Sequence, residues 1–289
     1  MEQQLQDMIN FDNGYLDNNG ILVVKNSYAS EASASKKAWE RIYDFDLAKI
    51  RLDRADFDAN KLEDHISYLK KYYHFNDQTK YLEIGCGPAH IGEYVMKNFN
   101  SYFIGVDFNY NILLTLKRYF DQKGYKKYLL INSDINQIPL KSNSIDFIYG
   151  GGVIEHFPDT RITLRESYRI LKGGGVSFNT VPAFNLWWLL RFYNNIPAVG
   201  IFKKVFEFIH EKIFRNKILE NNYGYELSYS KSILRKIHQE CGFHNIIIEA
   251  FAFHPSHHRL NNKILRDLYF QIQKHELTTA IYLVVAGKN

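Results

Sequence analysis

The chain has few of the residues that mark small secreted or metal-binding proteins. Its 289 residues include two cysteines, Cys86 and Cys241, and six prolines. Two cysteines cannot form a disulfide framework, and neither lies in a C-x-x-C or Cys/His pattern with the spacing of metal ligands. The histidines of segment 254–258 have no carboxylate or thiolate at ligand spacing, which favours a solvated loop. The sequence therefore predicts no metal site and favours a reducing, cytoplasmic setting.

Charge and hydrophobic length are also modest. The formal net charge is +5 and no dense block of lysine and arginine is present, so nucleic acid is not a favoured partner. The longest uncharged run lies between Lys172 and Arg191 and contains glycines, asparagines and a proline, so no membrane-spanning helix is expected. Residues 1–10 lack the apolar stretch of a secretory signal.

The chain is rich in aromatic residues, with 21 tyrosines and 21 phenylalanines, and most of it should fold around an interior. From Lys80 onward, short apolar runs alternate with longer helical stretches, which is typical of a parallel α/β sheet. The expected strands are 81–84, 102–106, 128–132, 145–150, 175–181, 245–253 and 280–286, the last two antiparallel at a sheet edge. The expected helices include 61–73, 91–98, 163–171 and 231–241. Residues 1–75 are predicted to be an extension with a hairpin at its Asp-Asn-Asn-Gly turn, and residues 76–289 the main domain.

A glycine loop follows the first strand of this domain. In Glu83-Ile84-Gly85-Cys86-Gly87 the strand runs into the loop and then into a helix, which places backbone N–H groups at the carboxyl end of the sheet. A dinucleotide fingerprint would have its third glycine at residue 90, which is histidine. The carboxylate of Glu83 suits a cationic ligand better than a phosphate.

Two more acidic residues follow the next two strands. Asp107 lies 22 positions after Gly85, close to the offset at which a carboxylate accepts hydrogen bonds from ribose hydroxyls. Asp134 follows the third strand and could accept from an adenine amino group, with Ile135 packed on the ring. Each glycine could instead permit a tight turn, and each aspartate could cap a helix.

Together with Glu155-His156-Phe157 and the run from Leu164 to Gly175, these motifs resemble the class I S-adenosylmethionine-dependent methyltransferase family, in its small-molecule type. The resemblance covers residues 80–181 strongly and the tail more loosely. It implies a Rossmann-like α/β sheet of seven strands in the order 3-2-1-4-5-7-6, with helices on both faces and S-adenosyl-L-methionine as cofactor. Ala89 departs from the pattern, because many relatives have a third glycine there. The expected cofactor-binding residues are Glu83, Gly85, Cys86, Gly87, Asp107, Phe108, Asp134, Ile135 and Gly150.

The catalytic assignment is less constrained. Methyl transfer from a sulfonium can be accelerated by alignment and by exclusion of water, so a base is optional. His156 is the first candidate base for a hydroxyl acceptor, and Glu155 is its rival. Either residue could also simply shape the pocket.

Residues 183–226 interrupt the α/β alternation and are predicted to form a helical lid or insertion. Apolar residues recur at helical spacing from Ile201, and segment 191–217 carries a net charge of about +4 from its lysines and arginines. The expected lid residues are Trp187, Trp188, Phe202 and Phe206. The segment could pack on the domain, form a dimer interface, or contact an anionic membrane surface through residues 187–214.

The sequence thus predicts a methyltransferase that acts on a small molecule, either a lipid-linked or quinone-like compound or a saccharide precursor. The rival hypotheses are an NAD(P)-dependent oxidoreductase and a non-catalytic scaffold with the same fold.

Overall fold

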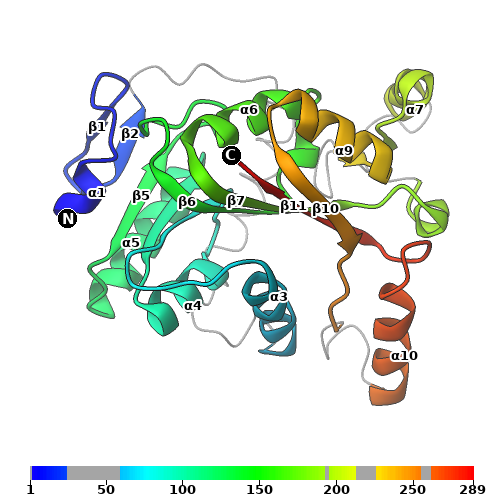
Figure 1. The fold of residues 1–289 in the computed structure, drawn as a ribbon, viewed down its shortest axis with the longest axis horizontal. Helices are drawn as coiled ribbons and strands as arrows, with labels where there is room; N and C mark the ends of the chain where they lie inside the picture. The colour runs from blue at the N-terminus through cyan, green and yellow to red at the C-terminus, as the bar shows by residue number, and fades with distance from the viewer. Residues whose placement is uncertain (1, 25–58, 193–194, 213–225, 255–261) are drawn as a thin grey trace.

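The computed structural model describes residues 2–24, 59–192, 195–212, 226–254 and 262–289. Within them, nine strands form one twisted sheet that runs through the centre of the molecule (Figure 1). In spatial order the strands are β1 (Gly14–Leu16), β2 (Leu22–Val24), β5 (Tyr128–Asn132), β4 (Tyr102–Asp107), β3 (Lys80–Ile84), β6 (Ile145–Gly151), β7 (Leu171–Pro182), β11 (Ile281–Gly287) and β10 (His244–Ala250).

The last seven strands of this order reproduce the expected arrangement. β5, β4, β3, β6 and β7 are parallel, and their carboxyl ends share one edge of the sheet. β11 is antiparallel to both β7 and β10, as expected for the final strand pair.

The prediction of seven strands is wrong in number, because the N-terminal extension adds two more. β1 and β2 form the hairpin expected at the Asp17 turn, and β2 then pairs in parallel with β5. Asp17 stabilises the turn by accepting hydrogen bonds from the backbone N–H groups of Asn19 and Ile21, each at 2.9 Å. The hairpin therefore shields the edge of β5, which would otherwise present unpaired backbone groups.

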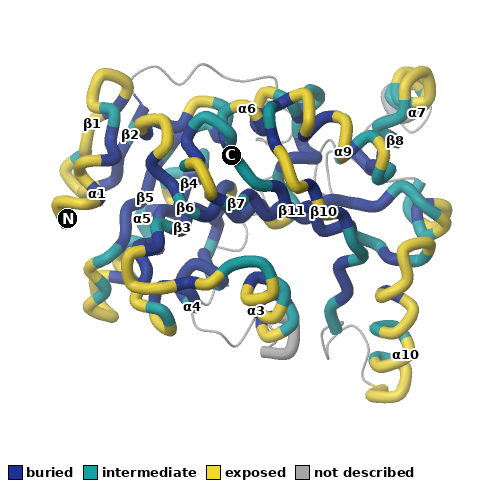
Figure 2. The backbone as a smooth tube through the Cα atoms, viewed as in Figure 1, coloured by how far each residue is buried: buried dark blue, intermediate teal, exposed yellow. Residues whose placement is uncertain are grey.

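Helices cover both faces of the sheet because apolar side chains alternate along its strands. In β6, Phe147 and Tyr149 lie in one core, while Ile148 lies in the other. The first core also contains residues of α3 (Ala59–Tyr72), α4 (His90–Phe99) and α5 (Tyr110–Gln122). The second contains residues of α1 (Gln3–Gln6), α6 (Thr160–Ile170) and α9 (Lys231–Glu240). Figure 2 shows the buried sheet between these more exposed helices.

Stacked aromatic rings fill the core beneath α3 and α4. The rings of Tyr81 and Phe147 stack with their centroids 5.8 Å apart, and those of Tyr149 and Phe178 with centroids 5.7 Å apart. Offset stacking of this kind adds about 0.5 to 1.5 kcal/mol per pair beyond the burial of area. Part of the large aromatic content is thereby accounted for by the interior of the sheet domain.

The insertion after β7 is only partly helical, which corrects the prediction of a helical lid. It contains the 3-10 helix η3 (Leu186–Leu190) and helix α7 (Gly200–Lys212), but also a small parallel sheet of β8 (Ile196–Pro197) and β9 (Leu227–Ser228). Residues 193–194 and 213–225 of this segment lie outside the described part of the chain. The 3-10 helix η2 (Ile154–His156) precedes α6, and α10 (Lys263–Gln273) precedes β11.

Candidate functional site

The glycine loop lies at the carboxyl end of β3, in the middle of the sheet. Gly85 is exposed and has φ of +60°, a left-handed conformation that favours glycine. A Cβ atom there would lie 2.9 Å from Cγ2 of Val153, so the loop also touches the segment after β6. Cys86 is buried and donates its backbone N–H to the carbonyl of Val106 at 3.0 Å. The loop is thus held against both neighbouring strands.

Ala89, which departs from the family pattern, ends the loop in a left-handed conformation with φ of +53°. Its side chain does not cap α4, which follows; instead, in the first turn of that helix, the backbone N–H of Gly92 is donated to a side chain of β3. Alanine in this region costs about 1 kcal/mol relative to glycine, so the departure affects stability more directly than binding.

Glu83 precedes this loop in β3 and is buried. Its Oε2 accepts a hydrogen bond from the backbone N–H of Gly92 in α4 at 3.0 Å. Burial raises its pKa to about 8, although the Gly92 hydrogen bond opposes the shift. The close approach of α4 requires glycine at residue 92, because a Cβ there would lie 2.1 Å from the ring of Phe103. Glu83 therefore joins the strand to the helix that flanks the loop.

Asp107 ends β4 and joins the glycine loop to the neighbouring strand. Its Oδ2 accepts from the backbone N–H of Gly87 and its Oδ1 from that of Asn109, both at 2.9 Å. Burial raises its pKa to about 6, and these backbone hydrogen bonds oppose the rise. A carboxylate can accept about four hydrogen bonds, so acceptor capacity remains for a ligand.

The ends of β4 and β5 are also tied together. Asn132 donates its side-chain amide to the carbonyl oxygens of Asp107 and Phe108, at 3.2 and 2.9 Å. Asp134 is partly exposed beside the buried Ile135 and accepts from the backbone N–H of Asn136 at 2.9 Å. The three predicted acidic residues therefore lie at or just after the carboxyl ends of three adjacent strands.

Gly150 has a packing explanation of its own. A Cβ at this residue would lie 2.3 Å from Oδ1 of Asn179 and 3.0 Å from Cδ1 of Ile84. The glycine thus allows β6 to fit between side chains of β7 and β3. The contact of Gly150 with the cofactor stays a prediction.

Both candidate bases lie in η2, directly after the strand next to the glycine loop. Glu155 is 2% exposed and His156 is 8% exposed. Oε2 of Glu155 is buried and has no hydrogen-bond partner in the described part of the chain. Burial raises the pKa of Glu155 well above its ordinary value, and the charge of Glu226 adds to the shift. A neutral buried carboxyl with a free oxygen is an unusual feature that local packing does not explain.

The four expected lid residues have different environments. Trp188 is buried, contacts the rings of Phe184 and Phe206 at centroid distances of 5.0 and 5.3 Å, and donates its indole N–H to the carbonyl of Asn195 at 3.1 Å. Trp187 is partly buried against Tyr269 of α10. Phe202 is 57% exposed and faces solvent. Trp188 and Phe206 therefore hold the insertion together, and Phe202 does not.

Helix α7 lies where apolar residues recur at helical spacing, but its orientation is unexpected. Its predicted apolar face is open, because Ile201 is 74% and Val205 45% exposed. The predicted polar face includes Lys203, which donates to the carbonyl of Pro158 just after η2 at 2.7 Å. The hypothesis that the apolar face packs on the domain is therefore wrong for these two residues.

Sequence reasoning missed three residues around Glu155. Arg191 and Glu226 lie close to each other, with Nη2 and Oε1 3.8 Å apart, and Ser228 is buried two residues later. No local pattern marks them, because they come from opposite ends of the insertion. They meet only through the pairing of β8 with β9.

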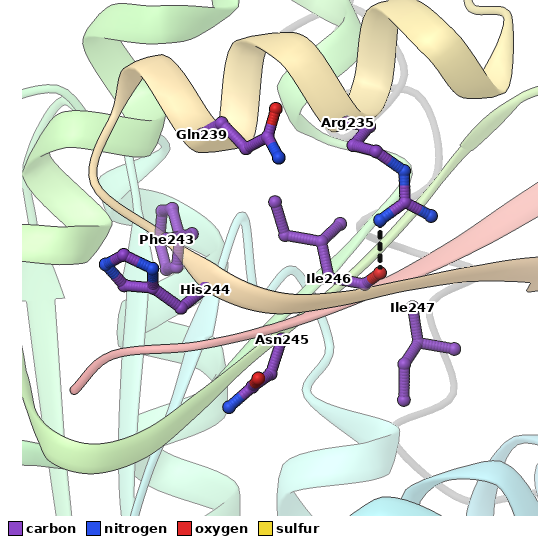
Figure 3. A pocket seen from close by; sticks show the side chains of 7 residues that line it. All are labelled: Arg235, Gln239, Phe243, His244, Asn245, Ile246 and Ile247. Atoms are coloured by element: carbon purple, nitrogen blue, oxygen red, sulfur yellow. Dashed lines mark hydrogen bonds between the residues drawn. The ribbon is translucent and has the colours of Figure 1, made fainter.

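A pocket on the far side of the sheet domain lies between α9 and the edge strand β10. Figure 3 shows Arg235 and Gln239 of α9 above the strand, with Arg235 donating to the carbonyl of Ile246 at 2.9 Å. Through Gly287 of β11, His244 at the start of β10 is level with Val176 in the middle of β7, not with the carboxyl end of that strand. Ligands of such sheets bind at the carboxyl ends of the strands, so this pocket is distinct from the site.

Metal ligands do not gather in the described ranges, where no three His, Cys, Asp or Glu side chains could hold an ion together. His254 instead pairs with Asp64, whose Oδ2 lies 2.9 Å from Nδ1. Residues 255–258 of the histidine segment lie outside the described part of the chain. No helix in that part is long and apolar enough to cross a membrane.

Comparison with known proteins identifies the domain that this site serves. Residues 82–178, which span β3 to β7, match the family model described as a methyltransferase domain. The chain contains a class I S-adenosylmethionine-dependent methyltransferase domain. The methyltransferase uses S-adenosyl-L-methionine as cofactor and acts on a small molecule. The oxidoreductase and scaffold hypotheses are thereby set aside.

Two similar proteins are demethylmenaquinone methyltransferases of staphylococci. A demethylmenaquinone methyltransferase of Staphylococcus saprophyticus is 27% identical over 194 residues, which cover 60% of this chain and 74% of that protein. Its counterpart in Staphylococcus haemolyticus is 26% identical over 196 residues, covering 64% and 77%.

Solved structures share the fold. The phosphoethanolamine N-methyltransferase 2 of Haemonchus contortus, in complex with S-adenosylhomocysteine, has a TM-score of 0.54 and 16% identity, covering 78% of this chain and 52% of that one. The YcgJ protein of Bacillus subtilis has a TM-score of 0.51 and 15% identity, covering 78% and 97%.

Proposed function

We propose that this methyltransferase acts on a small hydroxylated acceptor with an apolar body, such as a quinone-type lipid. The observation that carries the proposal is the exposed apolar surface of the insertion that follows β7. Leu189 and Leu190 of η3 are 61% and 72% exposed, and Ile201 and Phe202 of α7 are exposed as well. An apolar acceptor would cover side chains that otherwise contact water. Similarity to the staphylococcal demethylmenaquinone methyltransferases supports the same class of acceptor.

The donor is proposed to lie over the carboxyl ends of β3, β4 and β5. The exposed Gly85 would allow its close approach, Asp107 would accept from the ribose hydroxyls, and Asp134 would accept from the adenine amino group. Glu83 would favour the positive charge of the donor. The flanking contacts are proposed for Cys86, Gly87, Phe108, Ile135 and Gly150. We also propose that residues 1–75 form the extension and residues 76–289 the methyltransferase domain.

Proton removal from a hydroxyl acceptor is proposed for the segment after β6. His156 and Glu155 are both buried there, beside Val153, which touches the glycine loop. The methyl group leaves the sulfonium as a new bond forms to the acceptor, and a base at this position would take the proton released: the hydroxyl proton where oxygen is methylated, or the ring C–H proton where a ring carbon of a hydroquinone is methylated. His156→Gln and Glu155→Gln should separate the two candidates, because only loss of the actual base should lower kcat strongly with donor affinity unchanged.

The same surface is proposed to contact an anionic membrane. Eleven of the seventeen exposed large hydrophobic side chains in the described ranges belong to η3, α7 and α10. These three elements lie at the same end of the long axis of the molecule (Figure 1), and Trp187 contacts α10 through Tyr269. Lysines such as Lys204 and Lys263 lie among them, and cationic side chains attract anionic lipid.

Vesicle co-sedimentation tests the membrane contact. Leu190→Ser should weaken binding to vesicles that contain phosphatidylglycerol, because the serine removes an exposed leucine from the surface. Ile162→Ser is the matched control, since Ile162 is 44% exposed on α6, outside this surface. Equal binding by both variants and the parent protein, or no binding by the parent, would contradict the proposal.

An acceptor assay tests the function itself. Formation of S-adenosylhomocysteine should be measured with reduced demethylmenaquinone in detergent micelles and, in parallel, with saccharide and lipid-linked saccharide acceptors. Turnover of the quinol is the expected result. Turnover of a saccharide alone would replace the proposed acceptor and leave the methyltransferase assignment intact.

A further inference from the structure

A cluster of buried polar groups surrounds Glu155 at the carboxyl end of β6. Oε2 of this residue is buried without a hydrogen-bond partner in the described ranges. Leaving a buried polar group unpaired costs about 1 to 3 kcal/mol, so such an atom needs an explanation, and binding of a ligand is one. Val153, two residues earlier, touches the glycine loop, which places the cluster beside the proposed donor site.

The small sheet of β8 and β9 brings three further polar side chains to this place. Ile196 donates its backbone N–H to the carbonyl of Glu226 at 2.9 Å, so Asn195 and Glu226 lie side by side at the start of the sheet. Alternation along β9 puts Glu226 and Ser228 on the same face. Ser228 is 1% exposed, and its Oγ is a second buried polar atom without a partner in the described residues.

The position of this sheet is fixed by the insertion itself. The indole N–H of Trp188 holds the carbonyl of Asn195, and the guanidinium of Arg191 lies 3.8 Å from Oε1 of Glu226. β9 packs against both η2 and β7. As a result, Glu226 and Arg191 are close enough to influence the ionisation of Glu155, in opposite directions.

We propose that Glu155, Glu226 and Ser228 form the subsite that binds the polar end of the acceptor, through hydrogen bonds donated by its neutral hydroxyl groups. This inference rests on the proposed function and identifies the residues that select the acceptor. Carboxyl oxygens without partners accept hydrogen bonds from hydroxyl groups, and Ser228 can accept or donate. Glu226 already pairs with the guanidinium of Arg191, so a carboxylate or phosphate at the same position would meet the like charge of Glu226.

An ammonium group is the main competing ligand. Two carboxyl groups would attract it, but Arg191 lies in the same cluster and repels a second cation. Arg191 already neutralises part of the negative charge of Glu226 and lowers the pKa of that carboxyl, which burial otherwise raises. The local charge therefore favours a neutral hydroxyl over an amine.

Binding of three probes that share a naphthalene ring and differ in their polar group tests the inference. With the protein saturated with S-adenosylhomocysteine, titration calorimetry should compare naphthol, naphthoate and (aminomethyl)naphthalene. We expect naphthol to bind most tightly. Glu226→Gln should lower the affinity for naphthol by roughly tenfold or more, as expected for the loss of a hydrogen bond to a charged group. Ser228→Ala should lower it by roughly two- to tenfold. Glu63→Gln, on the exposed side of α3, should change nothing.

The outcomes separate this inference from the function on which it rests. If the parent protein binds no S-adenosylhomocysteine, the proposed function itself fails. If the donor product binds equally to all variants, they are folded and the probe data decide. Tightest binding of naphthoate or of the amine, no binding of any probe, or equal naphthol affinity in all variants would overturn the subsite.

Discussion

Glu83 gives the most specific prediction, because its carboxyl is buried beside the glycine loop that we propose binds the donor, and its pKa is about 8. The donor carries a positive sulfonium and an amino group, so it should bind more tightly when Glu83 is ionised. Below pH 8 the protein must release the proton of Glu83 to reach this state. Donor affinity should therefore fall as the pH falls.

The size of this effect follows from the pKa. One pKa unit corresponds to about 1.4 kcal/mol, so at pH 6 ionising Glu83 costs roughly 2.7 kcal/mol. If only the ionised form binds, affinity should rise by up to roughly fiftyfold between pH 6 and pH 8. Asp107, with a pKa of about 6, adds roughly a factor of two over the same range.

Titration calorimetry with S-adenosylmethionine from pH 6 to pH 9 provides the assay. Two buffers of different ionisation enthalpy report the number of protons released on binding. Because the donor's own amino group titrates near pH 8, the difference between the parent protein and Glu83→Gln is diagnostic. Glu83→Gln should lose most of the pH dependence, while Glu63→Gln should retain it. Identical pH profiles for Glu83→Gln and the parent would refute the reasoning.

Ionisation of Glu83 should also affect the free energy of unfolding, but in the opposite direction: donor affinity should rise with pH, and stability should fall. The folded pKa of Glu83 lies above the value of about 4.3 expected in the unfolded chain. The folded state then binds more protons between these values, so the contribution of Glu83 to stability is present at low pH and is lost as pH rises toward 8. Urea unfolding of the ligand-free protein at pH 5 and pH 8 should show a larger loss for the parent than for Glu83→Gln. An equal loss in both would contradict the assigned shift.

Three further substitutions test the site. Asp107→Asn should weaken S-adenosylhomocysteine binding by about 1 to 3 kcal/mol in calorimetry, because it removes the charge that accepts from Gly87 and the proposed ribose contact; unchanged affinity would exclude that contact. Gly85→Ala should weaken the same binding more than Gly124→Ala, since both glycines have positive φ but only the first would meet a side chain; equal effects would leave backbone strain as the whole cause. Trp188→Phe should lower the free energy of unfolding by about 1 to 3 kcal/mol by leaving a buried carbonyl without its donor, and unchanged stability in thermal unfolding would show that another group replaces the indole.

Much of the sheet could be predicted because each strand is a short apolar run bounded by turn residues. The expected strand 128–132 has the observed bounds of β5, and 81–84 differs from β3 by one residue. The end of α6 was less predictable: residue 171 was expected in the helix, but it is the first residue of β7. Helix boundaries depend on a few terminal hydrogen bonds that periodicity does not specify. The two strands added by the extension follow from pairing across the sheet, which also leaves no local signal.

The orientation of α7 shows a second limit of prediction from sequence. Helical spacing of apolar residues predicts a helix, and α7 is one over Gly200–Lys212. It does not say which face meets the protein, because an apolar face can cover a core, a partner or a ligand. Here Lys203 contacts the domain and Ile201 faces outward.

The proposed donor site and the proposed acceptor subsite therefore differ in how they are encoded. The proposed donor residues lie at consecutive strand ends, so their motifs are local in sequence, and a family model that ends at residue 178 contains nearly all of them. The proposed acceptor subsite depends on Glu155 meeting Glu226 and Ser228 from across the insertion. A substitution in β9 can change its chemistry without altering the donor loop. Relatives with the same donor motifs can accordingly act on different acceptors, and the residues around β8 and β9 are where such differences should be sought.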